Sequence, residues 1–398
     1  MVIFYLNMAE FINRRIAPQI LESLTHNYVT AIIGPRRCGK STLAKHIAKK
    51  FSNSIFIDLE RNSDLAKLED SEWFLSSQRG KLICIDEIHR KPDLFPLIRS
   101  LTDEWEYNGA FLIVGSASRD WLKQISKTFA GRISYHRLTP FLWNEVGDRT
   151  DIEKYRLLGG FPRSMLAATP KISFRWRENF ISTFLERDLL QWAGFSPQTM
   201  RRLWQMLAHT NGQTTNFSMF ARSLGVSGPT VKNYIDLLRE TFMVELLPPY
   251  VSHLGKRLVR STKVYIADSG ITAALLGLKD FTQITGHPVL GSLWEQMALT
   301  NLKGEFEDAE FFFYRTTGGA EMDIVMKYHG KVIAIECKST LSPSLSKGNY
   351  YAIEDIRPVA TFVVAPVREG WSLRPGVTVV SLEELIKRVH EINSQSPI

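Results

Sequence analysis

The residues Gly34-Pro35-Arg36-Arg37-Cys38-Gly39-Lys40-Ser41-Thr42 decide the fold of this chain. They match the pattern G-x-x-x-x-G-K-[ST] at every fixed position. A β-rich apolar run at residues 28–33 comes before them, and the residues that follow have helical spacing. Pattern and context together predict a strand, a phosphate-binding loop of the Walker A type and a helix.

Such a loop directs several backbone N–H groups and the positive end of a helix to one point, where a di- or triphosphate binds. Gly34 and Gly39 keep the bend free of side chains. Lys40 is expected to reach the β- and γ-phosphates, and the hydroxyl of Ser41 to ligate Mg²⁺. The alternative, a chance glycine turn before a helix, does not explain why pattern and context agree.

The bulk properties are those of an ordinary globular protein. The 398 residues allow two or three domains, at roughly 150 residues each. Apolar residues make up 44% and charged residues 23% of the chain. No apolar run approaches the ~18 residues of a membrane helix, and the first residues lack the basic region of a signal peptide. Cys38, Cys84 and Cys337 have no metal spacing, and their odd number argues against a disulfide framework. A cytoplasmic location is therefore expected.

Positive charge is concentrated in one part of the chain. The net charge is +8, and residues 200–263 hold nine Lys or Arg against three Asp or Glu. A basic segment suggests a polyanionic partner. The alternative is a solvated basic face.

A second acidic motif follows the loop. Residues 54–59 form a predicted strand, and residues 81–87 form another that ends in Asp86 and Glu87. Ligands bind at the carboxyl ends of buried parallel strands. We expect Asp86 to hold the hydration shell of Mg²⁺ opposite Ser41, as in a Walker B motif, and Glu87 to act as general base toward the attacking water.

The next strand, residues 111–114, is followed by Ser116, which can contact the γ-phosphate or the attacking water. The alternative is a simple turn serine. A fifth strand is predicted over residues 133–138. Arg119 and Arg132 are candidate charge-stabilising arginines, although each also fits an exposed surface position.

Further motifs give the chain a family resemblance. They are Leu138-Thr139-Pro140-Phe141, Gly159-Gly160-Phe161-Pro162 and Glu186-Arg187-Asp188-Leu189-Leu190. With the two Walker motifs they resemble a large family of predicted bacterial and archaeal AAA+ ATPases, which carry a C-terminal domain similar to restriction-endonuclease-like folds. The resemblance covers nearly the whole chain and implies ATP rather than GTP.

The middle of the chain reads as helical. By resemblance, residues 146–195 form a small helical lid over the nucleotide. Residues 197–241 give three helical segments with a glycine turn before the third, and strands follow at 243–247 and 263–267. This layout predicts a winged helix over residues 196–275.

DNA is the expected partner of the winged helix. Ser227, Thr230, Lys232 and Asn233 would face the groove. A basic wing would meet phosphates through Lys256, Arg257 and Arg260. The alternative is a protein-docking or interdomain module.

The last part has the order αβββαβ over residues 280–398. Asp323 lies on its second strand, and Glu336 and Lys338 lie on the third, which looks like the PD-(D/E)xK nuclease core. A two-residue turn at His329-Gly330 places Asp323 opposite Glu336, and Lys338 shares a strand face with Glu336.

The chemistry of this group admits three interpretations. In an active nuclease, Asp323 and Glu336 hold Mg²⁺ and Lys338 positions or activates water for attack on a phosphodiester. By resemblance, Glu295 completes the site. The other two interpretations are a nuclease-like fold that is inactive and an exposed salt-bridged hairpin.

The sequence thus predicts an α/β protein with four parts: a P-loop core at 1–145, the lid, the winged helix and the nuclease-like domain. The first functional hypothesis is an ATP-dependent, DNA-processing enzyme with a Mg²⁺-dependent nuclease-like site. The second is a nucleotide-controlled DNA- or protein-binding switch whose nuclease-like domain cuts nothing. A protein-remodelling ATPase is a third, more distant hypothesis. No membrane contact is expected; a homo-oligomer or a protein partner remains open.

Overall fold

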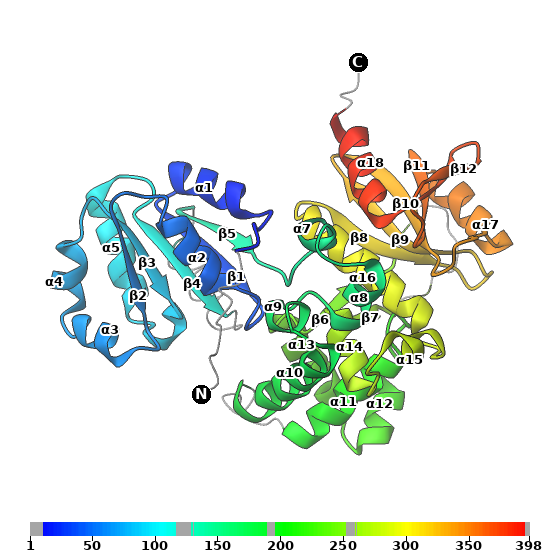
Figure 1. Cartoon of the computed structure of the whole chain (residues 1–398), viewed down its shortest axis with the longest axis horizontal. Coiled ribbons are helices and arrows are strands. Elements are labelled where there is room, and N and C mark those ends of the chain that lie inside the picture. Colours follow the sequence, from blue (N-terminus) through cyan, green and yellow to red (C-terminus); the bar gives the residue numbers. More distant parts are fainter. Residues whose placement is uncertain are drawn as a thin grey trace, which may run out of the picture. The chain divides into compact units, whose positions relative to one another are not determined.

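A computed structural model describes residues 11–116, 129, 131–188, 196–251, 259 and 261–394 of the chain. The chain forms two compact units, Met1–Arg149 and Thr150–Ile398, drawn in Figure 1. Among the helices of the described residues, none combines the length and the apolar character that crossing a bilayer requires.

The first unit is built on a five-stranded parallel sheet in the order β2-β3-β4-β1-β5 (Figure 1). This confirms the predicted parallel α/β core. The central strands are buried because they are continuous apolar runs. The strands are β1 (Val29–Gly34), β2 (Ser54–Asp58), β3 (Leu82–Asp86), β4 (Phe111–Ser116) and β5 (Ile133–Arg137).

The helices of this unit are α1 (Ala17–His26), α2 (Lys40–Ala48), α3 (Asn62–Lys67), α4 (Ser71–Ser76), α5 (Leu94–Trp105) and α7 (Trp143–Val146), with a 3-10 turn at Ile88–Arg90. The sequence pattern over Phe11–Leu24 predicts a helix that leads into β1, but residues 11–14 are not helical. The helix begins at Ala17, with Pro18 in its first turn, because proline is tolerated there and breaks a helix further in.

The second unit opens with helices on either side of the Gly159-Gly160 break. They are α8 (Ile152–Leu158), α9 (Pro162–Met165), α10 (Pro170–Thr183) with a π-helical turn at Phe184–Asp188, α11 (Pro197–His209), α12 (Phe217–Leu224) and α13 (Gly228–Glu240). Strands β6 (Val244–Leu247) and β7 (Lys263–Ile266) pair antiparallel. Thr214 forms a β-bridge with Lys263, so a segment between α11 and α12 lies beside β7.

Two buried charges join the early helices of this unit to α14 (Ser269–Leu275). The Arg177 guanidinium donates hydrogen bonds of 2.8 Å to the carbonyls of Leu157 and Gly270. The Asp268 carboxylate accepts from the backbone N–H groups of Gly160 at 2.7 Å and Ile271 at 2.9 Å. Because these groups satisfy carbonyls and amides at helix ends, they fix how the two segments pack.

The C-terminal part is a six-stranded sheet in the order β12-β13-β11-β10-β9-β8. Its strands are β8 (Glu310–Arg315), β9 (Glu321–Tyr328), β10 (Lys331–Cys337), β11 (Ala360–Val364), β12 (Trp371–Arg374) and β13 (Val377–Val380). Its helices are α15 (Phe281–Thr285), α16 (Leu290–Glu305), α17 (Lys347–Ile356) and α18 (Leu382–Ser394). The order αβββαβ is present, and β12, β13 and α18 extend it beyond what the sequence predicted.

The hairpin between β9 and β10 has the predicted register. Tyr328 pairs with Lys331 and Ile324 pairs with Ile335. The turn residues His329 and Gly330 both have positive φ, 47° and 75°, as a two-residue hairpin turn requires. The prediction that residues 323 and 336 face each other is therefore confirmed.

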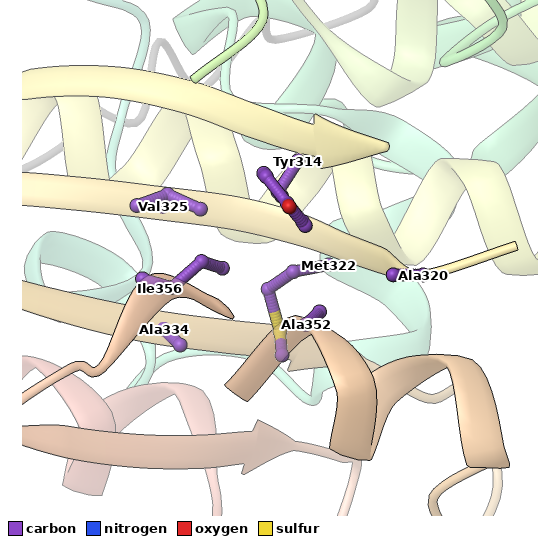
Figure 2. Close-up of a cluster of buried hydrophobic side chains, with 7 residues drawn as sticks. All are labelled: Tyr314, Ala320, Met322, Val325, Ala334, Ala352 and Ile356. Carbon is purple, nitrogen blue, oxygen red and sulfur yellow. The ribbon is translucent and has the colours of Figure 1, made fainter. Parts of the chain in front are cut away.

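Helix α17 closes one side of this sheet through a small apolar cluster. Figure 2 shows Met322 and Ala334 on the strands facing Ala352 and Ile356 on the helix. Met322 is fully buried. Close packing of this kind fixes the end of β9 that carries Asp323.

Substituting Met322 by Ala is expected to lower the free energy of unfolding by about 2–5 kcal/mol, because it removes buried methylenes and leaves a cavity. Denaturant titration measures the effect. The matched control is Tyr351→Ala on α17, whose side chain is 52% exposed; it should change stability by less than about 0.5 kcal/mol. Equal effects of the two substitutions would contradict the packing described.

Candidate functional site

The predicted phosphate-binding loop lies between the carboxyl end of β1 and the start of α2. Gly34 has a φ of 151°, and a Cβ atom there would come within 2.1 Å of the carbonyl oxygen of Leu138. Gly39 caps α2 in the left-handed region, with φ 103°. Both positions therefore require glycine, and the first amides of α2 are left uncovered for an anion.

Lys40 and Ser41 stand where the motif predicts. Lys40 is buried, and its ammonium donates to the carbonyls of Gly34 at 3.1 Å and Pro35 at 2.9 Å, inside the loop. Ser41 hydrogen-bonds to the side chain of Asp86 at the end of β3. Burial raises the pKa of Asp86 to about 6, against the lowering effect of the Ser41 hydrogen bond. Hydroxyl and carboxylate oxygens are ligands that suit Mg²⁺, so the pair fits the predicted cation.

Glu87 follows Asp86 in a backbone conformation that is uncommon for a residue other than glycine, with φ 54° and ψ 40°. Its N–H donates to the Asp86 carboxylate at 3.1 Å. Burial raises the pKa of Glu87, while the nearby Lys40 lowers it. A raised pKa suits a general base. The predicted base contacts the cation ligand Asp86 and is near enough to Lys40 for that charge to lower its pKa.

Two residues near this site were not predicted. The His89 Nδ1 atom lies 3.2 Å from a carboxylate oxygen of Glu87. Arg14 is buried and donates to the carbonyl of Cys38 in the loop at 3.1 Å, to that of Thr139 at 2.7 Å and to Glu145 at 3.1 Å. Arg14 thus ties the phosphate loop to the chain segment that follows β5.

The remaining predicted loop residues differ in exposure. Arg37 and Thr42 are exposed, Cys38 is buried, and Arg36 lies 3.9 Å from Glu60.

Ser116 ends β4 and pairs in the parallel register with Gly34; its side chain lies outside what the structure describes. Arg132 forms an ion pair of 2.7 Å with Asp103, and Arg119 lies outside the described residues.

The second predicted site lies in the C-terminal sheet, and the structure brings its three residues together. The Lys338 ammonium donates to Glu336 at 2.7 Å. The Asp323 carboxylate accepts from the N–H of Cys337 at 2.9 Å, and the N–H of Asp323 lies 3.4 Å from Glu336. Glu336 is buried, which argues against the interpretation of an exposed salt-bridged hairpin.

Glu295 and an unpredicted residue, Lys263, complete the group. Glu295 comes from α16, as the resemblance implies. The Lys263 ammonium lies 2.8 Å from Glu295 and 3.7 Å from Asp323, and the hydroxyl of Tyr265 also donates to Glu295. We call Lys263, Glu295, Asp323, Glu336 and Lys338 the carboxylate cluster.

Burial and neighbouring charges shift the pKa values of residues in the carboxylate cluster. Burial and then Asp323 raise the pKa of Glu336 to about 8. Burial opposes a charge on Lys263, but the attraction of Glu295 and Asp323 is stronger and raises its pKa. Two ammonium groups thus face three carboxyl groups.

The predicted Mg²⁺ does not fit this cluster as it is built. Within the part of the chain that the structure describes, no group of three or more His, Cys, Asp or Glu side chains is placed to hold a metal ion. Lys263 lies between two of the carboxylates instead. A cavity of about 470 Å³ adjoins the cluster, lined in part by Lys263, Glu295 and Asp323.

The candidate DNA-contacting residues are only partly described. Lys232 is exposed on α13; Lys256, Arg257 and Arg260 lie outside the described residues. Ser227 caps α13 by accepting from the N–H of Thr230 at 3.2 Å. Lys263, which contributed to the basic count of this stretch, is buried and adds nothing to a basic surface.

Family models match three parts of the chain. Residues 26–147 match an AAA domain, residues 149–282 a domain of unknown function (DUF8612) and residues 290–385 a domain of unknown function (DUF4143). The first match agrees with the loop geometry, so the first unit is a P-loop domain of the AAA ATPase type. The other two matches name no activity.

One relative covers nearly the whole chain. The uncharacterized protein Rv2008c of Mycobacterium tuberculosis is 36% identical over 377 residues, which are 94% of this chain and 85% of the relative. The chain belongs to the family of Rv2008c. This Rv2008c family also includes the uncharacterized protein Mb2031c of Mycobacterium bovis, with the same identity and coverage. A Haemophilus influenzae protein is 21% identical over 66% of this chain and 72% of its own length.

Solved structures resemble the chain only distantly. A Thermotoga maritima RuvB variant is 19% identical, with a TM-score of 0.32, over 62% of this chain and 89% of that one. AMPPCP-bound DnaA from Aquifex aeolicus is 12% identical, with a TM-score of 0.31, over 56% and 86%. Likeness at this level carries no functional argument.

Replacing Arg14 by Met is expected to cost about 3–5 kcal/mol of stability, because it leaves the Glu145 carboxylate buried without its cation. The double substitution Arg14→Met with Glu145→Leu should recover most of that loss. Chemical denaturation of the single and double variants measures both. A double variant no more stable than Arg14→Met would contradict a direct coupling of the two side chains.

Proposed function

We propose that the chain is an ATPase whose hydrolysis cycle controls DNA binding by its second unit. One observation carries the proposal: Lys40, Ser41, Asp86 and Glu87 converge at the carboxyl end of one parallel sheet. That is the place where α/β sheets bind ligands.

Each residue has a defined task in this proposal. The amides at the start of α2 and the ammonium of Lys40 bind the phosphates. Ser41 and Asp86 would hold Mg²⁺, which would neutralise negative charge on the transferred phosphoryl group. Glu87 orients the attacking water and takes its proton. Arg14 holds the loop in place by donating a hydrogen bond to the carbonyl of Cys38.

DNA binding rests on charge and on the order of elements. After α11, the Thr214 bridge, α12, α13, β6 and β7 follow in the sequence that a winged helix needs. Several basic side chains are exposed on the three helices: Arg201, Arg202, Arg222, Lys232 and Arg239. Such a surface favours a polyanion such as duplex DNA.

The two sequence hypotheses differ in what the C-terminal domain does. In one, its carboxylates hold Mg²⁺ and cut DNA. In the other, the domain cuts nothing and serves the switch. The position of Lys263 between Glu295 and Asp323 favours the second, and we propose that version.

Lys40→Ala is expected to abolish ATP binding, whereas Glu87→Gln should keep binding and slow hydrolysis by about 10²-fold or more. Calorimetry with ATP and Mg²⁺ and a phosphate-release assay measure the two effects. Lys49→Ala is the matched control, since Lys49 is an exposed lysine that caps the other end of α2. Normal hydrolysis by Glu87→Gln would refute its role as base.

Lys232→Glu is expected to weaken duplex binding several-fold at moderate salt and to reduce the log–log salt slope by about 0.9, because one phosphate contact is lost. The same change at Lys256, Arg257 or Arg260 should act likewise. Fluorescence anisotropy over a salt series, with and without ATP, measures it. The control is Lys347→Glu on α17, an exposed lysine in the C-terminal sheet domain. Unchanged binding by all four variants would leave the winged-helix segment without a DNA role.

A further inference from the structure

The carboxylate cluster gathers charges from four elements of the second unit. Glu295 comes from α16, Asp323 from β9 and Glu336 from β10, while Lys263 comes from β7. Carboxylates placed this close repel one another unless a cation lies among them. The identity of that cation decides what the cluster can do.

The carboxylates of the cluster already have donors from the protein. Lys263 and Tyr265 donate to the same oxygen of Glu295. The N–H of Cys337 donates to Asp323 at 2.9 Å, and Lys338 donates to Glu336 at 2.7 Å. A divalent ion at these oxygens would have to compete with the two ammonium groups that already lie beside them.

Lys263 is held firmly in its position. Its side chain is 4% exposed, and its ammonium lies 5.4 Å from the centre of the Phe313 ring. Its backbone belongs to β7, paired with Leu247 of β6 and bridged to Thr214. Residues adjoining β6 in turn reach β8, because the N–H of Tyr250 donates to the carbonyl of Phe313 at 2.7 Å. The lysine is thus anchored from both sides.

We infer that the ammonium of Lys263 takes the place of a divalent cation between Glu295 and Asp323, so that the cluster is a lysine-neutralised joint rather than a metal centre. Lys338 likewise neutralises the carboxylate of Glu336. The joint fastens β7 to the C-terminal sheet. The inference depends neither on ATP hydrolysis nor on DNA binding, and it explains how a nuclease-like set of carboxylates is neutralised by two lysines of the chain itself.

Removing the ammonium of Lys263 should leave the cluster able to bind a divalent cation. Lys263→Met keeps much of the side-chain volume but leaves Glu295 and Asp323 facing each other without a cation. Oxygen ligands in this arrangement suit Mn²⁺ or Mg²⁺. The variant should therefore gain a divalent site that the natural chain does not have.

The test is isothermal titration of MnCl₂ into the nucleotide-free full chain. Five proteins are compared: the natural chain, Asp323→Asn, Lys263→Met, Lys263→Met combined with Asp323→Asn, and Lys263→Arg. We expect the first two to behave alike. Lys263→Met should bind Mn²⁺ at least 10-fold more tightly than the natural chain, and the double variant should lose that gain. Lys263→Arg, which keeps the charge, is the matched control and should gain nothing.

Three outcomes overturn the inference. One is Mn²⁺ binding by the natural chain that Asp323→Asn abolishes; another is a folded Lys263→Met that gains no site. The third is a Mg²⁺-dependent plasmid nick made by the natural chain and lost in Asp323→Ala. If Lys263→Met does not fold, the natural chain and Asp323→Asn alone decide the question. Nucleotide and DNA are absent from the titration, so failure of the ATPase proposal would leave its result unaffected.

Discussion

The shared direction of the strands in the first unit is the constraint on which its chemistry depends. Parallel pairing puts Gly34 beside Ser116 and Asp58 beside Asp86, so the polar ends of several strands meet at one edge. The loop can lie at that edge only because Gly34 admits the Leu138 carbonyl at close range. A side chain at position 34 would push the loop away from its neighbours.

Much of this could be predicted because the signals are local. The loop motif specifies its own turn and helix start through glycines and a lysine within nine consecutive residues. The pairing of Asp323 with Glu336 was predictable for a similar reason, since a two-residue turn fixes the register of the whole hairpin. Where a short stretch determines its own geometry, the sequence is sufficient.

The missed features depend on contacts between distant parts of the chain. Arg14 meets Cys38, Thr139 and Glu145, and nothing in its local sequence indicates those partners. Lys263 gave one usable signal, a lysine opening the apolar strand Lys263–Ile266, and a buried lysine needs a carboxylate partner. Which carboxylate it meets is decided by tertiary packing. The hairpin of β12 and β13 was missed, although its two-residue turn Pro375-Gly376, with Gly376 at φ 77°, is a local signal.

The joint between β7 and the C-terminal sheet links two segments of the chain that match different family models. Lys263 falls in the region that matches DUF8612, while Glu295 and Asp323 fall in the region that matches DUF4143. A chain severed between the two regions would leave buried acids on one fragment and an orphaned ammonium on the other. In this chain, the two segments that family models treat as separate therefore depend on each other for the neutralisation of their buried charges.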